Sequence, residues 1–220
     1  AARFGLADAG NIYGRLTNPT VDIFEQRVAA LEGGVAALAT ASGAAAVTYA
    51  IQNVALAGDH IVAAKNIYGG TYNLLAHTLV DYGVETTFVD PLKPEEFEAA
   101  IKENTKLIYF ESLTNPTMEL TDIAAISKLA HKNGVLVAVD NTFTPPPEVY
   151  PLKEGADIVL HSCTKYINGH GDVISGAIIG STELITPIRK GVTSKICGTT
   201  PSPFNSFLIL RGLQTMELRM

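Results

Sequence analysis

The chain has few cysteines, no strongly basic stretch and no apolar run long enough to cross a membrane as a helix. Its two cysteines, Cys163 and Cys197, are too few for a disulfide framework and fit a reducing cytoplasm, the location we expect. They lack zinc-site spacing, so we expect no metal. The formal net charge is -6 and no basic run can neutralise phosphates, which argues against nucleic acid as a partner. A membrane helix needs about 20 apolar residues, so no membrane partner is expected either.

The length and hydrophobicity of the chain suit one sizeable core. It has 220 residues, of which 47% are hydrophobic. Its first residues, Ala1-Ala-Arg-Phe-Gly5, do not combine a basic start with an apolar core, as a signal peptide would. It begins without methionine and stops at Leu218-Arg-Met220, inside a segment with helical spacing. We therefore expect it to be part of a longer polypeptide.

Short β-rich runs alternate with segments of helical spacing along most of the chain. This alternation predicts βαβ units, and hence an α/β fold with a mostly parallel sheet flanked by helices. The expected strands are 35–40, 59–64, 84–90, 107–110, 134–140, 156–160 and 173–180. The expected helices are 19–32, 43–57, one after Tyr72, 94–102, 120–133, 182–190 and 204–220. Residues 191–203 are rich in Gly, Pro and Thr and are expected to form a loop.

Three helix ends have sequence signals. Asn18 is expected to cap the first helix with Pro19 at its first position, and Gly33 to end it. Thr121 is expected to cap the helix of residues 120–133. Residues 1–17 show no sustained period and are interpreted as an N-terminal arm.

Two expected strands should deliver a carboxylate and an amine to the same edge of the sheet. One strand ends in Asp140, and the other leads into His161-Ser-Cys-Thr-Lys165. In open α/β sheets, ligands bind outside the carboxyl ends of the strands. A lysine there can form a Schiff base, and an aspartate facing the ring nitrogen of pyridoxal phosphate keeps that nitrogen protonated. Either residue alone is more often a solvated charge or a turn residue, but the pair favours the cofactor.

Other strand ends offer groups that can bind a phosphate. Ser42-Gly43-Ala44 opens a helix directly after a strand, where backbone N–H groups can bind an anion. A simple helix cap explains Ser42-Gly43 about equally well. Ser162 and Thr164 can add hydroxyl donors, and Arg15 a charged one.

Three further residues follow expected strands. Tyr68 can stack on an aromatic cofactor and present its hydroxyl to a substrate. Glu111 and Asn115 follow the fourth strand. Taken singly, each has a more ordinary interpretation: Tyr68 as an aromatic in a turn, Glu111 as a carboxylate at a strand end, and Asn115 as a turn residue before Pro116.

Together these segments resemble the pyridoxal-phosphate-dependent enzymes of cysteine and methionine metabolism. That family includes O-acetylhomoserine sulfhydrylases, methionine γ-lyases, cystathionine γ-synthases and cystathionine γ-lyases. The resemblance runs nearly end to end, in family order. The motifs that carry it are Tyr13-Gly-Arg15, Asn18-Pro-Thr20, Ser42-Gly43, Tyr68-Gly-Gly-Thr71, Glu111 with Asn115-Pro116, Val139-Asp-Asn-Thr142, and Ser162-Cys-Thr-Lys-Tyr166 with Gly169-His170.

The resemblance implies the large domain of a fold-type-I pyridoxal-phosphate-dependent transferase. On this basis we expect residues 1–17 to be an arm, residues 18–200 the cofactor-binding domain, and residues 201–220 the start of a connecting helix. The family's small C-terminal domain, which supplies an arginine for the substrate's α-carboxylate, has no counterpart in these residues.

The resemblance also implies roles around the ring of pyridoxal 5'-phosphate. Lys165 would hold the cofactor covalently and then move protons on the substrate. Asp140 would pair with the ring nitrogen, and Tyr68 would stack on the ring and assist departure of the γ-substituent. Glu111 and Asn115 would lie near the ring substituents.

Further residues are implied at the cofactor phosphate. Backbone N–H groups of Gly43 and Ala44 and the hydroxyls of Ser162 and Thr164 would bind it. Family members usually have methionine or glutamine at the position of Ala44, but a backbone contact survives that change.

Tyr13 and Arg15 would reach the phosphate of a neighbouring subunit's cofactor. The implied assembly is a homodimer or homotetramer with shared active sites.

The implied reaction is γ-replacement on an activated homoserine, O-acetylhomoserine with sulfide or a thiol. The alternative is γ-elimination by a methionine or cystathionine γ-lyase. Tyr68-Gly-Gly-Thr-Tyr-Asn-Leu-Leu75 is similar to the sulfhydrylases, and Gly70 replaces the cysteine characteristic of methionine γ-lyases. Tyr166-Ile-Asn-Gly-His-Gly-Asp-Val173 is more similar to the γ-lyases, and the segment 180–201 lacks the insertion of many sulfhydrylases.

Two other classes stay open. A different fold-type-I enzyme, such as an aminotransferase, would share Lys165 and Asp140 but not the combination of Tyr13, Arg15 and Tyr68. A fragment that binds the cofactor without turnover is the other.

Overall fold

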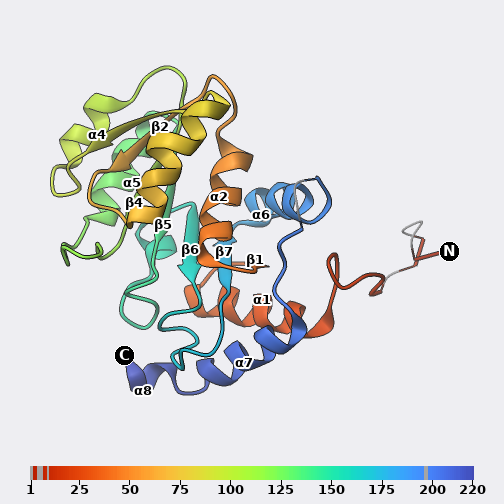
Figure 1. The fold of residues 1–220 in the computed structure, drawn as a ribbon. Coiled ribbons are helices and arrows are strands. Elements are labelled where there is room, and N and C mark those ends of the chain that lie inside the picture. The colour runs from red at the N-terminus through yellow and green to blue at the C-terminus, as the bar shows by residue number, and fades with distance from the viewer. Residues whose placement is uncertain (1, 4–6, 9, 196–197) are drawn as a thin grey trace.

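A seven-stranded sheet in the order β1-β7-β6-β5-β4-β2-β3 forms the centre of the computed structural model, which describes residues 2–3, 7–8, 10–195 and 198–220 (Figure 1). The strands are β1 Ala36–Thr40, β2 His60–Ala64, β3 Glu85–Val89, β4 Thr105–Glu111, β5 Leu136–Asp140, β6 Ile158–Ser162 and β7 Gly176–Gly180. Neighbours from β3 through β6 pair in parallel. In contrast, β7 runs antiparallel to both β6 and β1. The expected α/β fold with a mostly parallel sheet is confirmed.

Helices cover the sheet, with α1 against β1 and β7 and α2 against β6 and β7. The α-helices are α1 Pro19–Glu32, α2 Gly43–Val54, α3 Gly69–Asn73, α4 Pro94–Ala100, α5 Ile123–Lys132, α6 Thr182–Lys190, α7 Pro203–Leu213 and α8 Met216–Arg219. Short π- or 3-10 turns are η1 Leu74–Thr78, η2 Leu79–Tyr82, η3 Pro151–Glu154 and η4 Gly191–Lys195. The described residues that directly precede α1, 10–17, run outward from the sheet (Figure 1). No helix in the described ranges is long and apolar enough to span a membrane.

The first helix has the ends that its sequence predicts. Asn18 Oδ1 accepts hydrogen bonds from the N–H groups of Thr20 and Val21, at 3.0 and 3.3 Å. Proline at the first position already has a helical φ and needs no N–H partner there. Gly33 ends the helix with φ 74°, a left-handed conformation that favours glycine.

A buried polar pair ties α1 to the strand that leads to Lys165. His161 Nε2 bonds the Glu32 carboxylate, and both side chains are fully buried. Asn141 Nδ2 donates to the same carboxylate oxygen at 3.2 Å. Buried polar groups are costly unless they are hydrogen-bonded, so this contact joins α1 to the end of β6.

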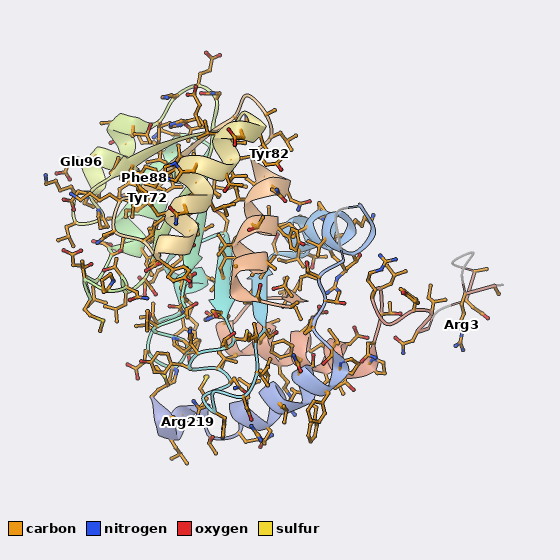
Figure 2. The ribbon with its side chains drawn as sticks, viewed as in Figure 1. Arg3, Tyr72, Tyr82, Phe88, Glu96 and Arg219 are labelled. Atoms are coloured by element: carbon orange, nitrogen blue, oxygen red, sulfur yellow. The ribbon has the colours of Figure 1, made fainter. Side chains whose placement is uncertain are left out.

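The short helix α3 is held against the edge strand β3. The rings of Tyr72 and Phe88 lie side by side with centroids 4.7 Å apart (Figure 2). Such aromatic pairs add stabilisation beyond their buried area. The contact fixes the segment that follows Tyr68.

The C-terminal residues form two helices, so the expectation of one long helix over 204–220 was wrong. The chain turns at Gln214 and Thr215, between α7 and α8. Arg219, labelled in Figure 2, donates to the carbonyl oxygens of Tyr166 and Gly212 at 2.6 and 2.8 Å. This guanidinium holds α8 against the loop that contains Lys165.

Two smaller expectations also need correction. Asp122, not Thr121, caps α5, since its Oδ1 accepts from Ala125 N at 2.9 Å. Thr121 instead donates to the Glu111 carbonyl oxygen at 2.8 Å. Within the expected loop 191–203, the first residues form the π-helical turn η4. Cys197 lies outside the described residues.

Two adjacent residues of α1 test this packing. Phe24 is fully buried, whereas Ile23 is 50% exposed. We expect Phe24→Ala to lower the free energy of unfolding by about 3–5 kcal/mol, because it leaves a cavity in the core. Ile23→Ala, the matched control, should cost less than about 1 kcal/mol. Urea unfolding measures both, and equal losses would contradict the described packing.

Candidate functional site

The ends of the parallel strands meet at one edge of the sheet and line a cavity of about 800 Å³. Because β7 runs the other way, its first residue lies at this same edge, and so does the loop before it. The lining includes these residues named from the sequence: Gly43, Ala44, Tyr68, Glu111, Asn115, Asp140, Ser162, Thr164 and Lys165. A cavity of this size suits a cofactor with a small substrate.

Tyr13 and Arg15 are not among the residues that line this cavity. The Arg15 guanidinium lies 5.3 Å from the centre of the Tyr13 ring and donates to the Thr193 carbonyl oxygen. Tyr13 is 56% exposed. Within one chain, the structure therefore separates these two residues from the other candidates.

The Asp140 carboxylate is held by the turn that follows β5. Its Oδ1 accepts hydrogen bonds from Thr142 N at 3.0 Å and from Thr142 Oγ1 at 2.5 Å. The same threonine hydroxyl accepts from Ser162 N at 2.8 Å. One threonine thus joins the ends of β5 and β6, a role typical of short polar side chains in turns.

Lys165 lies in a tight turn after β6. Its backbone N–H donates to the Ser162 carbonyl at 3.1 Å, and its own carbonyl accepts from Gly169 N at 2.7 Å. Thr164 Oγ1 accepts from the Ser175 N–H at 3.2 Å, so the turn is tied to the approach to β7. The Lys165 side chain lines the cavity, is exposed, and makes no hydrogen bond or ion pair within the described part of the chain.

The start of α2 and the end of β6 form a tight cradle. Ser42 caps the helix by accepting from Ala45 N at 3.1 Å. The N–H groups of the first helical residues, Gly43 and Ala44, have no acceptor within the helix and lie at the cavity. A Cβ on Gly43 would lie only 2.6 Å from Ser162 Cβ, so only glycine allows this approach. Free N–H groups at a helix N-terminus, next to a serine hydroxyl, make an anion site.

Glu111 connects two loops at the cavity rim. Its Oε1 accepts from Tyr68 N at 2.6 Å, and its Oε2 accepts from Asn115 N at 3.0 Å. Burial, and secondarily the charge of Asp140, raises the pKa of Glu111 to about 7. Since both oxygens bind backbone N–H groups, this carboxyl positions the residues around it.

The electrostatics of the cavity are asymmetric. Burial also raises the pKa of Asp140, although the Thr142 bonds oppose the shift. Two neighbouring carboxyls with raised pKa values favour a positive charge between them, because an opposite charge stabilises the ionised form. The α2 terminus favours a negative charge at the other end. A ligand with a cationic ring and an anionic phosphate, as pyridoxal phosphate has, fits this arrangement.

Sequence reasoning missed two polar residues that shape the site. Thr142 lies in a motif singled out from the sequence, but the sequence did not reveal that its hydroxyl holds Asp140. Tyr109 lies two positions before Glu111, and alternate residues of a strand share a face. This two-residue spacing was the sequence signal that could have placed Tyr109 beside the site. In the ranges the structure covers, no group of three or more His, Cys, Asp and Glu side chains is placed to hold a metal.

Comparison with known proteins identifies the family. The model of the Cys/Met metabolism PLP-dependent enzyme family matches residues 1–220. The chain belongs to this family. It is 49% identical over 219 residues to an L-methionine gamma-lyase of Porphyromonas gingivalis, covering 99% of this chain and 55% of that protein. It is 43% identical over 259 aligned residues to an O-acetyl-L-homoserine sulfhydrylase of Leptospira meyeri, covering all of this chain and 59% of that protein.

Solved structures agree with the family assignment. MetB from Corynebacterium glutamicum superposes with a TM-score of 0.92 at 44% identity, over 95% of this chain and 54% of that one. MetY from Campylobacter jejuni superposes with a TM-score of 0.91 at 35% identity, over 99% of this chain and 62% of that one. The MetY structure contains N'-pyridoxyl-lysine-5'-monophosphate, a lysine joined to the cofactor. The chain spans about half the length of the curated relatives it matches.

The Glu111 carboxyl predicts a pH dependence of stability in the cofactor-free chain. Between about pH 4.5 and 7, the folded chain keeps a proton that the unfolded chain has lost. This contribution to the free energy of unfolding therefore falls as the pH rises, by roughly 3 kcal/mol in total. Glu111→Gln cannot titrate, so urea unfolding at pH 5 and pH 8 should show a smaller loss than in the wild type.

The exposed Glu103→Gln variant is the control and should keep the wild-type pH dependence. Identical pH dependence in Glu111→Gln and the wild type would contradict the raised pKa.

Proposed function

We propose that the chain is the cofactor-binding part of a pyridoxal-phosphate-dependent enzyme that replaces the γ-substituent of an activated homoserine, O-acetylhomoserine, with sulfide or a thiol. The observation that carries this proposal is the placement of Lys165 and Asp140 in one cavity with a cradle for a phosphate. The family is pyridoxal-phosphate-dependent, and its members include sulfhydrylases.

When bound, pyridoxal phosphate supplies a ring that withdraws electrons from the amino acid attached to it. Lys165 Nζ holds the cofactor. In the reaction it takes a proton from the substrate Cα, delivers it to the cofactor, and then takes a proton from Cβ so that the γ-substituent can leave. The lysine suits this task because its side chain has no structural partner in the described residues. Asp140 faces the ring nitrogen and stabilises its proton.

The phosphate lies at the start of α2 in this proposal. The N–H groups of Gly43 and Ala44 and the hydroxyl of Ser162 donate to it. The Thr164 hydroxyl also donates, in exchange for its bond of 3.3 Å to the Ser175 carbonyl. The contact between Gly43 and Ser162 supports this arrangement, because it brings both sets of donors together.

Tyr68 stacks on the ring and donates a proton to the departing γ-group. Its side chain is 55% exposed at the cavity, and the Glu111 carboxyl holds its backbone. Glu111 also holds Asn115, which lies near the ring substituents. The Glu111 carboxyl therefore joins the two loops beside the ring.

Gamma-elimination, as in methionine or cystathionine γ-lyases, is the second candidate function. Its support is the group of relatives named L-methionine gamma-lyase, which are 42–49% identical to the chain. In favour of replacement, Gly70 lies where methionine γ-lyases characteristically have cysteine. A Cβ on Gly70 would lie 2.5 Å from Tyr68 Cε1, so the tyrosine ring uses the space that a cysteine would need.

The assembly in this proposal is a homodimer or homotetramer in the cytoplasm. Tyr13 and Arg15 reach the phosphate of a neighbouring subunit's cofactor. Both side chains are exposed and neither lines the cavity of its own chain, which supports a role outside that cavity.

Lys165→Ala should bind no cofactor covalently and should lose turnover, while the fold survives because the side chain has no structural partner. The wild type incubated with pyridoxal phosphate should gain an absorption band at the visible edge. Borohydride should then fix the cofactor on the peptide that contains Lys165. Lys190→Ala, at an exposed position outside the cavity lining, is the control. Fixation on another lysine would refute the assignment.

Substrate assays distinguish replacement from elimination. With O-acetylhomoserine and sulfide, we expect a sulfur-containing amino acid as the main product. With methionine alone, we expect a 2-oxoacid and ammonia to be released more slowly than that amino acid is formed. The reverse ratio would assign the chain to the γ-lyases, and Lys165→Ala is the blank for both assays.

A further inference from the structure

The Asp140 carboxylate has a second support, which comes from the neighbouring strand. Tyr109 is fully buried in β4, and its hydroxyl donates to Asp140 Oδ2 at 3.4 Å. The strand register explains the meeting. Glu111 pairs with Asp140 in β5, and Tyr109, two positions earlier, faces the same side of the sheet.

This hydroxyl reaches the only carboxylate oxygen that the turn leaves available. Both Thr142 bonds end on Asp140 Oδ1. Within the described ranges, Tyr109 is the only donor to Oδ2. If Oδ2 faces the ring nitrogen, Tyr109 binds that oxygen directly. If Oδ1 faces it, the bond of Tyr109 to Oδ2 still sets the orientation of the carboxylate.

The hydroxyl of Tyr109 is buried in the sheet, so it needs hydrogen-bond partners. The next residue of β4, Phe110, is also fully buried and packs on Phe97 with centroids 6.0 Å apart. A buried hydroxyl costs free energy unless it is hydrogen-bonded. Tyr109 has two partners for it, the Asp140 carboxylate and the Thr71 side chain of α3.

The phenol stays protonated and therefore remains a donor. Burial, together with the negative charges of Asp140 and Glu111, raises the Tyr109 pKa well above its ordinary value. A hydrogen bond to an ionised carboxylate stabilises the ionised form. Tyr109 therefore opposes the effect of burial on Asp140.

From this geometry we infer that Tyr109 is a positioning residue, which sets the orientation and the basicity of the carboxylate that pairs with the cofactor's ring nitrogen. The inference rests on the proposed function. Without the hydroxyl, Asp140 becomes more basic and takes a larger share of the ring nitrogen's proton. The ring then withdraws fewer electrons, and the group joined to Lys165 keeps its own proton to a higher pH.

The test uses the full chain loaded with pyridoxal phosphate labelled with ¹⁵N in its ring. Tyr109→Phe should raise the pH midpoint of the visible absorption by roughly half a unit to one unit, because only part of the effect of losing a hydrogen bond to the charged Asp140 is passed on through the ring. The ring ¹⁵N resonance should move toward the value of an unprotonated nitrogen. Both readouts are independent of turnover.

Two controls separate this role from simple packing. Tyr49→Phe removes another buried hydroxyl, which bonds Thr199 and lies outside the cavity lining, and should leave both readouts unchanged. Thr71→Val removes the other partner of Tyr109 and should have little effect. Unchanged readouts in Tyr109→Phe would overturn the inference, and so would the full shift in Thr71→Val.

A further variant keeps the test decisive if Tyr109→Phe does not fold. 3-Fluorotyrosine placed only at position 109 makes the phenol a stronger donor, so the pH midpoint should move downward. No shift there would also overturn the inference. A wild-type chain that shows no visible band with pyridoxal phosphate would instead overturn the proposed function, and the inference with it.

Discussion

The shared direction of strands β1 to β6 is the constraint on which the site depends. Because these strands point the same way, residues far apart in sequence, such as Tyr68 and Asp140, end at one edge of the sheet. The reversed strand β7 adds to this edge, since the loop before it contains Lys165 and must return there. The location of the site thus follows from the topology of the sheet.

The side chains at that edge are held mainly by short contacts with the backbone. Thr142 fixes one oxygen of Asp140, Glu111 fixes Tyr68 and Asn115, and Arg219 fixes the loop after Lys165. Lys165 itself lacks such a support among the described residues, which leaves its amine available to a ligand. Rigid surroundings with one unengaged amine are the arrangement that a covalently bound cofactor requires.

The sequence predicted the parts of the site that depend on strand ends, and missed those that depend on exact packing. Lys165, Asp140 and the start of α2 follow from periodicity and the family motifs, and the structure brings them together. Tyr109 was missed because it lies inside an apolar run, where its two-residue spacing from Glu111 was the one sign that it shares a strand face with that carboxyl. The break between α7 and α8 was missed because helical spacing continues through it, and only tertiary contact with the Lys165 loop reveals it.

The close contact between Gly43 and Ser162 constrains the order in which the chain can fold. At the cradle, Gly43 approaches Ser162 too closely for a side chain on the glycine. A Cβ on Gly176 would likewise clash with the Ser42 carbonyl. The start of α2, the end of β6 and the start of β7 must therefore meet without side chains between them. Contacts between residues so far apart in sequence form late, because a long loop must close first. During synthesis, the anion site can therefore be completed only after β7 has emerged and paired between β1 and β6. Until then the nascent chain has an incomplete cofactor site.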